Sequence, residues 1–258
     1  MTGILVSDFL GGIMIYIRIL AMLVVVPLFN NKNIPMVPKL ALSLLITYII
    51  LFSVDTSNIK YDDSLIPLAL IAFKEGITGL LMGLILRFVF EGIGFAGLNI
   101  GRDMGLVMTE MFDPSTESQN NMLTILMIMM ATVVFLMIKG HHFIIQALIY
   151  SFKVIPLGFF PVNESVHTLM IKYSAIMFIL SIQIAAPVMA AFFLIHLASG
   201  ILSRVSPNFQ VFFVILPLKI IVGIGIFIVL IPMYVYLFET LLKNYETKLL
   251  DIIKYMAG

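Results

Sequence analysis

The chain has 258 residues, of which 61% are hydrophobic and 11% are charged, and its net charge is +1. Soluble domains are about 45–50% apolar and about 25% charged, and a soluble core of this length cannot bury so much apolar surface. The composition therefore predicts an integral membrane protein, while the near-neutral charge gives no basis for nucleic-acid binding. Cysteine is absent, which excludes disulfides and cysteine-based catalysis or metal sites.

Several apolar segments follow one another along the chain. A helix that crosses a membrane needs about 20 apolar residues; some segments reach this length and others are short or interrupted. The pattern predicts an all-α integral membrane protein of about six long, partly kinked helices arranged as hairpins. The segments are residues 9–29, 40–54, 65–98, 122–138, 143–160, 173–197 and 211–238.

Residues 74–114 are largely apolar, like a membrane-spanning helix, yet they include charged residues and many glycines. Residues 65–111 are predicted to form one long or kinked helix, or a helical hairpin bent near residues 92–97. Gly92, Gly94 and Gly97 have the spacing of a dinucleotide-binding fingerprint, but that motif needs a preceding strand and this sequence is helical. No cofactor is therefore expected. Small residues four apart favour close helix packing instead, and they are Gly79, Gly83, Gly97, Gly101 and Gly105.

Arg18 lies near the middle of the first apolar segment. An arginine there costs about 2.5–3.5 kcal/mol on insertion scales, so we expect it to face protein or a wet cavity, with a carboxylate such as Glu75 or Glu91 as its partner. The alternative is a side chain that extends to a lipid headgroup, which is less favourable from mid-helix. Arg87 and Glu91 are four residues apart and are expected to pair on one helix face.

Asp113 and Pro114 follow the glycine-rich segment and are predicted to lie in a turn. Thr116 and Gln119 have the spacing of a capping box, which predicts the start of the helix at residues 122–138. That helix is rich in methionine, a side chain that adapts its shape. One interpretation is a deformable seal, and the favoured one is ordinary helix packing. The methionines are Met122, Met127, Met129, Met130 and Met137.

The last two long segments are predicted to form a helical hairpin with a turn at Pro207 and Asn208. Prolines inside apolar helices are expected to kink them. Beyond residue 238, apolar residues recur at helical spacing, with Glu239 and Lys243 as a pair on the other side. This tail is predicted to be an amphipathic helix that leaves the membrane or lies on a partner. The prolines are Pro187, Pro217 and Pro232.

No catalytic constellation stands out in the sequence. Serines are scattered without a nucleophile-elbow pattern. His141 and His142 are adjacent and would point to different faces of a helix, whereas a metal pair on a helix needs a spacing of four. His167 and His196 lie apart in the sequence. We therefore expect no metal and no enzymatic activity; a metal or haem site at these histidines is the alternative.

Landmark residues run along the chain from end to end. They are Arg18, Pro27, Pro35, Pro38, Lys39, Glu75, Gly79, Gly83, Glu91, Gly92, Ala96, Gly97, Met104, Gly105, Asp113, Pro114, Gly140, His141, His142, Ser151, Phe152, Pro156, Ala186, Pro187, Arg204, Pro207, Pro217 and Gly223. In this order they resemble the FliR family of flagellar biosynthetic proteins, which includes the equivalent subunit of virulence type III secretion systems. No single landmark is specific, but the ordered set is. One departure is Asp103, where the family commonly has glutamine.

The resemblance implies a structural, non-enzymatic subunit of the flagellar type III protein export gate, which helps form the conduit for unfolded flagellar proteins. It implies a FliP-like part at residues 1–170 and a FliQ-like hairpin with its amphipathic tail at residues 171–258. The implied partners are FliP-like and FliQ-like membrane subunits, FlhB, FlhA, export substrates and membrane lipid. The implied location is the flagellar basal body in the bacterial inner membrane.

Glycines and buried charges are then expected to serve helix packing and subunit interfaces. The residues given this role are Arg18, Glu75, Gly79, Gly83, Arg87, Glu91, Gly97, Gly101, Gly105, Asp113 and Pro114. The rival hypothesis is a secondary transporter of a small solute, because broken helices and buried charges also fit that class. Two matching repeat halves with breaks at the membrane midplane are not evident, which disfavours the transporter.

Overall fold

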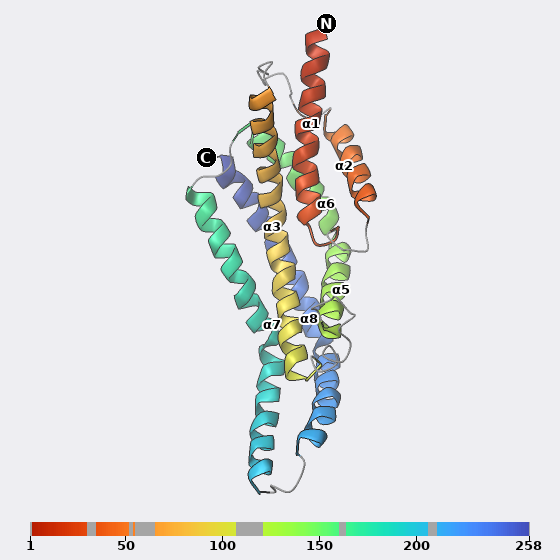
Figure 1. The fold of residues 1–258 in the computed structure, drawn as a ribbon, viewed down its shortest axis with the longest axis vertical. Helices are drawn as coiled ribbons and strands as arrows, with labels where there is room; N and C mark the ends of the chain where they lie inside the picture. The colour runs from red at the N-terminus through yellow and green to blue at the C-terminus, as the bar shows by residue number, and fades with distance from the viewer. Residues whose placement is uncertain are drawn as a thin grey trace. The chain divides into compact units, whose positions relative to one another are not determined.

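A computed structural model describes residues 2–29, 35–51, 54, 65–106, 121–159, 164–205 and 211–257. Within these residues all regular structure is helical (Figure 1). The helices are α1 (Thr2–Val25), α2 (Met36–Leu51), α3 (Leu65–Asp103), α5 (Met122–Met137), α6 (Gly140–Val154), α7 (Glu164–Val205) and α8 (Val211–Ala257). The all-α prediction is confirmed for the part of the chain that the structure describes.

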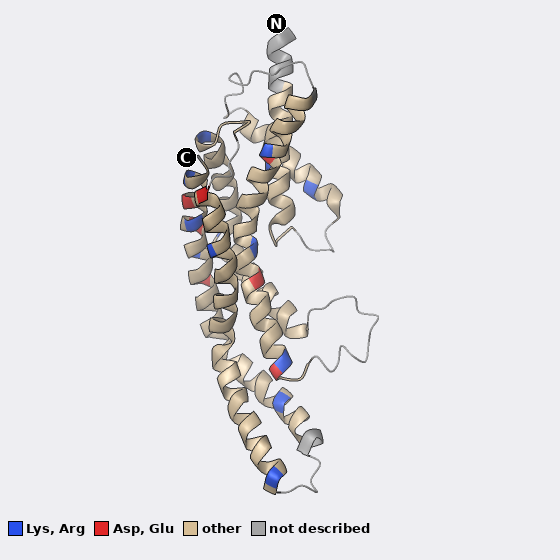
Figure 2. Ribbon diagram, turned by 60° about the vertical axis from the view of Figure 1, so that its left-hand side comes forward, with Lys and Arg blue, Asp and Glu red and all other residues tan. Residues whose placement is uncertain are grey.

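Three helices are long and apolar enough to cross a membrane, and they lie at Ile66–Asp103, Glu164–Val205 and Val214–Met256. α5 and α6, which are separated by a short break and bent by 68°, pass the same test together, as a broken span or a re-entrant loop. α1 contains a shorter apolar stretch, and α2 has only 16 residues. Charged residues take up little of the helical ribbon, most of which is coloured for other residue types (Figure 2). These lengths support the predicted membrane class, with helices that differ widely in length.

α3 decides between the two predictions for the glycine-rich segment. It is one helix of 39 residues that continues through Gly92, Gly94 and Gly97, so the alternative of a hairpin bent there is wrong. The helix stops where Gly105 takes a left-handed backbone, with φ of 82°, and the N–H of Leu106 donates to the carbonyl of Gly101 at 2.9 Å. This is a glycine-type helix end. The glycines within α3 therefore serve packing and do not reverse the chain.

α5 begins with a cap made by Asn121, whose side-chain oxygen accepts a hydrogen bond from the backbone N–H of Thr124 at 2.8 Å. The predicted capping box, Thr116 and Gln119, lies outside the described residues. Asn121 directly precedes the helix and has the residue type that caps best. The cap of α5 is therefore Asn121, which the sequence analysis did not select.

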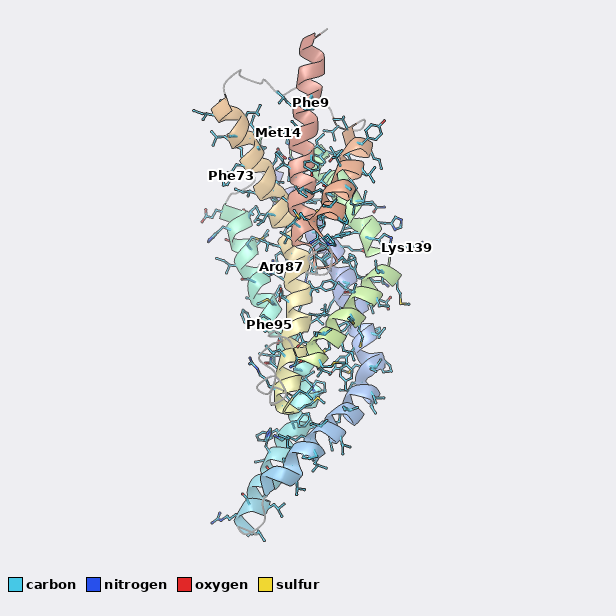
Figure 3. The ribbon with its side chains drawn as sticks, turned by 45° about the vertical axis from the view of Figure 1, so that its right-hand side comes forward. Phe9, Met14, Phe73, Arg87, Phe95 and Lys139 are labelled. Carbon is cyan, nitrogen blue, oxygen red and sulfur yellow. The ribbon has the colours of Figure 1, made fainter. Side chains whose placement is uncertain are left out.

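α6 is short because the sequence interrupts it at both ends. Before it, Lys139 has a left-handed backbone with φ of 62°, and the chain turns there (Figure 3). After it, the helix ends at Val154, ahead of Pro156 and Gly158. Gly158 has a positive φ of 83°, which glycine adopts at little cost. The predicted interruption of residues 143–160 is confirmed.

α7 and α8 are longer than the apolar segments that predicted them. α7 has 42 residues and α8 has 47, and both helices continue through their prolines. The predicted turn at Pro207 and Asn208 lies outside the described residues. α8 also takes in the predicted amphipathic tail, so the last apolar segment and the tail form one helix.

The tail of α8 packs on its own chain. Its apolar face is buried, and the ring of Tyr245 meets the ring of Phe143 in α6 edge-on, with centroids 6.3 Å apart. Lys248 lies 5.9 Å from the ring centre of Tyr173, near the start of α7. Helices of the same chain thus cover this face, so the alternative in which it lies on a partner is wrong. That the tail leaves the membrane stays a prediction. The buried residues are Leu242, Tyr245, Leu249, Ile252, Ile253 and Met256.

The chain divides into two compact units. Unit 1 comprises Met1–Phe88, Lys139–Ser174 and Leu242–Gly258, and unit 2 comprises Val89–Ile138 and Ala175–Leu241. α3, α7 and α8 each contribute to both units. The FliP-like and FliQ-like parts concern family likeness along the sequence, not compactness, and they stay a prediction.

Unit 1 contains a helix that turns its hydroxyl groups inward. α2 packs on α1, and its Ser43 and Thr47 are buried, with their hydroxyls donating to the backbone carbonyls of Leu40 and Ser43 at 2.8 and 2.7 Å. The outer face of α2 carries Leu44 and Ile49, both exposed. A surface helix of a water-soluble protein has the opposite arrangement, with its polar side chains outward. The arrangement in α2 therefore suits an apolar environment.

Unit 2 is held by aromatic contacts between α3, α5 and α7. The rings of Phe90 and Phe135 meet edge-on at 6.1 Å, and those of Phe95 and Phe178 stack at 6.0 Å (Phe95 is labelled in Figure 3). Such pairs add about 0.5–1.5 kcal/mol beyond burial. The core of unit 2 thus contains pairs of aromatic rings, whereas the core of unit 1 contains the charged side chains of Arg18 and Glu75.

Candidate functional site

The first candidate is a buried ion pair in unit 1 that joins α1 to α3. Arg18 Nε donates to a carboxylate oxygen of Glu75 at 2.6 Å, and both side chains are fully inaccessible to solvent. Glu75 is one of the two carboxylates that the sequence offered as partners. The alternative, a side chain extended to a lipid headgroup, is excluded because Arg18 has no exposed surface.

The rest of the Arg18 guanidinium holds the end of α6. Its two terminal nitrogens donate to the backbone carbonyl of Ile155 at 3.2 and 3.3 Å, and one of them reaches the hydroxyl of Ser151 at 3.4 Å. Its central carbon lies 4.3 Å from the ring centre of Phe152. A positive charge at a helix C-terminus is favourable, because the last carbonyls there lack partners.

Glu75 also fixes the loop that follows α6. Its second carboxylate oxygen accepts from the backbone N–H of Gly158 at 2.7 Å, and the neighbouring Lys74 donates to the carbonyl of the same glycine at 3.2 Å. Two consecutive residues of α3 therefore hold both polar groups of one residue. We call the set Arg18, Glu75, Lys74, Ser151, Ile155 and Gly158 the polar staple.

The polar staple is possible because α1 and α3 approach very closely. A Cβ atom added to Gly79 would lie 3.0 Å from the backbone carbonyl carbon of Arg18 and closer still to its oxygen. One at Gly83 would lie 2.9 Å from the carbonyl oxygen of Met22. Small residues four apart thus allow two backbones to touch. Packing at these two glycines occurs within the chain.

Gly97 and Gly101 serve the same purpose in unit 2, against the start of α5. A Cβ at Gly97 would lie 2.7 Å from the Cα of Thr124, and one at Gly101 would lie 2.6 Å from the side-chain carbon of Asn121. Asn121 Nδ2 in turn donates to the carbonyl of Leu98 at 3.3 Å. The space beside these glycines is filled by the same chain, so any effect on another subunit would be indirect.

Comparison with known proteins assigns the chain to a family. Residues 9–245 match the family described as "Bacterial export proteins, family 1". The chain belongs to this family. The stretch begins before Arg18 and ends beyond the tail residue Leu242, so it contains the whole polar staple.

Individual relatives agree with the family and extend nearly end to end. "Flagellar biosynthetic protein FliR" of Bacillus subtilis (strain 168) is 32% identical over 229 residues, which cover 87% of each chain. The protein of the same name from Escherichia coli (strain K12) is 29% identical, over 92% of this chain and 90% of the relative. That of Aquifex aeolicus (strain VF5) is 28% identical, over 84% of each. The resemblance that the landmarks predicted is confirmed.

The other residues given an interface role in this export family member lie in several places. Arg87 and Glu91 are both on α3, four residues apart (Arg87 is labelled in Figure 3). Gly105 forms the end of α3, where its Cβ position would lie 3.4 Å from Leu216. Asp113 and Pro114 lie outside the described residues. A contact of any of these residues with another subunit stays a prediction.

The methionines of α5 do not share one face. Met127 is fully buried, whereas Met122 is 77% and Met129 is 63% exposed. Met130 is half-buried. Met122, Met129 and Met137, which is 75% exposed, are spaced by seven and eight residues on the exposed side and could line one surface together. The seal interpretation remains a prediction.

Several members of the polar staple were not chosen from the sequence as site residues. Ser151 was noted only as a landmark, and Lys74 only as a charge in an apolar stretch. Gly158 lies in the apolar segment at residues 143–160, where it was not chosen as a site residue. Carbonyl and N–H groups are present at almost every residue, so no sequence signal distinguishes the ones that Arg18 and Glu75 bind. Among the described residues, no group of three or more histidines or acids is placed to hold a metal ion.

Proposed function

We propose that this chain is a structural subunit of the flagellar type III protein export gate and helps to form the conduit for unfolded flagellar proteins. The observation that carries the proposal is the family match over residues 9–245, in a chain whose helices have membrane length. Relatives that cover 87% and 92% of this chain are named flagellar biosynthetic proteins. Its place would be the bacterial inner membrane, at the flagellar basal body.

The partners in this proposal are FliP-like and FliQ-like membrane subunits, together with FlhB and FlhA. Residues 1–170 would form a FliP-like helical part, and residues 171–258 a FliQ-like helical hairpin with its amphipathic tail. The exposed apolar surface supports the presence of such neighbours, since only 11% of the most apolar stretch of α8 is buried within the chain. The role is architectural and not enzymatic, and energy for export would come from other components.

Within this function the polar staple acts as a fixed internal cross-link. It joins α1, α3 and the end of α6, and every charged atom of Arg18 has a partner. A fully partnered charge pair makes one arrangement of helices much more favourable than any other, because shifting a helix would leave a buried charge unpaired. We infer that it sets the register of helices on which neighbouring subunits assemble.

The test measures assembly and export in a flagellated species from which its own copy of this gene has been deleted. The tagged full-length chain should restore swimming and secretion of flagellar proteins, and small membrane subunits should co-purify with it in mild detergent. Failure of both would contradict the proposal. Saturable uptake of a small solute by the isolated chain in proteoliposomes would also contradict it, because a gate subunit alone has no such activity.

A further inference from the structure

The part of α7 and α8 that belongs to unit 2 exposes an apolar surface with a polar pair in it. Lys219 Nζ lies 2.6 Å from His196 Nε2, so one residue from each helix forms the pair. On α7 the pair is flanked by Phe193, which is 62% exposed, and by Leu197, which is half exposed. Lysine and histidine are costly on a surface of this kind unless an anion or water meets them.

The pair carries one positive charge with no acid beside it on its own two helices. Two cations this close would repel strongly, so the Lys219 ammonium donates to a neutral His196 ring. The sequence from Ala175 to Phe238 contains no aspartate or glutamate. The hairpin itself therefore supplies no acid to compensate this cation in its apolar setting.

Among the described residues, Asp103 at the end of α3 is an acid on a helix that packs on α8. The side chain of the next residue, Met104, lies against Gly223, one turn beyond Lys219 on α8. Arg102 directly precedes Asp103 in the sequence. Among the described residues, the contact of Lys219 is with His196 and not with a carboxylate.

Gly200 marks room for another helix next to this pair. It lies four residues after His196, on the same side of α7, and it is exposed. A Cβ added there meets nothing within 4 Å, in contrast to Gly97 and Gly101, whose neighbours are already in place. A helical glycine with open space beside it allows a second backbone to come close.

We propose that the surface formed by Phe193, His196, Gly200 and Lys219 docks an apolar helix of another subunit, and that this helix carries a carboxylate which meets Lys219. His196 is a positioning residue that holds the ammonium group toward the partner. A lipid phosphate is a poorer match, because Lys219 lies eight residues, about 12 Å, into α8, while Arg204 stands near the end of the hairpin, where headgroups would lie. The inference rests on the proposed function and names the chemistry of one of its contacts.

The first experiment compares variants of the full-length tagged chain by co-purification in mild detergent. Gly200→Leu and Lys219→Met should lower the yield of co-purified membrane subunits about tenfold, which corresponds to about 1.4 kcal/mol, while the chain itself stays monodisperse. Lys219→Arg and His196→Gln, which keep a donor and an acceptor, should retain most of the yield. His196→Leu should lose it.

Three results would overturn this inference. Unchanged yield in Gly200→Leu and Lys219→Met would mean that nothing docks at this surface, while co-purification by the parent chain would leave the proposed function intact. A loss in Asp103→Asn equal to that in Lys219→Met would identify Asp103 as the counter-charge. Absence of co-purified subunits with the parent chain would remove the proposed function as well.

A second measurement does not depend on destabilised variants. A photoreactive phenylalanine analogue replaces Phe193 or Leu197, both exposed, and cross-linked peptides are identified by mass spectrometry in intact cells. The expected peptide is an apolar helix of another membrane subunit with aspartate or glutamate in it. Cross-links only to lipid, or only to helices without an acid, would overturn the proposal.

Discussion

Unit 1 and unit 2 each contain a cation in apolar surroundings, and they treat it differently. In unit 1, Arg18 is fully buried and has a carboxylate, a helix end and a ring as partners. In unit 2, Lys219 has His196 as its partner, on a surface that remains open. The first arrangement is complete within one chain, and the second contains no anion among the described residues.

This difference separates what holds the subunit together from what it offers to others. A complete buried pair contributes specificity to the fold, because any rearrangement leaves an unpaired charge. An incomplete pair on an exposed apolar surface contributes little to the fold and favours association. Stability and assembly should therefore respond to different substitutions, which can be measured separately.

The largest effect should come from Glu75→Leu. It leaves Arg18 buried without a carboxylate and should cost about 3–5 kcal/mol, measured as loss of monodisperse protein after graded heating in detergent. The double variant Arg18→Met with Glu75→Leu should recover much of the loss, because neither charge then remains. Lys219→Met serves as the comparison and should lose monodisperse protein at the same temperature as the parent. Equal stability of Glu75→Leu and the parent would remove the distinction between the two cations.

Gly79→Ala tests close packing against open space. The new methyl group would overlap the backbone of Arg18, and overpacking of this kind costs about 1–3 kcal/mol. Gly200→Ala is the matched control, since its methyl group meets nothing within 4 Å and alanine favours a helix over glycine by about 0.5–1 kcal/mol. The same heating assay should show opposite signs for the two variants; equal shifts would contradict the assigned geometry.

Asn121→Ala tests a fastening inside unit 2. It removes the cap of α5 and the bond to the Leu98 carbonyl, with an expected cost of about 1 kcal/mol. Asn121→Ser keeps a capping oxygen and should lose less. The measurement is the midpoint of heat-induced loss of helical circular dichroism. If serine and alanine are equal there, the hydrogen bond to Thr124 contributes nothing.

The smallest effect should follow Lys139→Gly. Lys139 has a left-handed backbone, which costs a residue with a side chain about 1 kcal/mol relative to glycine. The variant should be more stable by up to that amount. Lys153→Gly, within α6, should instead be less stable by about 1 kcal/mol, and a shift of the same sign in both would contradict the backbone assignment.

The polar staple shows how far sequence reasoning reaches. Arg18 could be predicted to need an acid, because a lone charge in an apolar helix is costly and the chain has few carboxylates. The carbonyl of Ile155 and the N–H of Gly158 could not, since backbone groups carry no identity in the sequence. The glycine spacing predicted close packing at Gly79 and Gly97, but spacing alone does not say which helix fills the space.

Helix ends and helix surfaces showed the same limit: their residue pattern was evident in the sequence, but what packs against them was not. The single helix through Gly92 could not be told from a hairpin, because glycine suits both a bend and a tight contact. The amphipathic tail was evident from its spacing, yet its cover was not, since an apolar face has the same sequence whether Phe143 or a partner lies on it. Local preference therefore predicted elements, and tertiary contacts decided their neighbours.

The hydrogen bonds that join Lys74 and Glu75 to Gly158 limit where the length of this chain can vary. The four residues from Ile155 to Gly158 must span a fixed distance, because Arg18 holds one end and both polar groups of the glycine are bonded at the other. An insertion or deletion there would detach one hold or the other. Natural length changes among relatives should therefore be absent from this short loop, although connections without such a double anchor are free to grow or shrink.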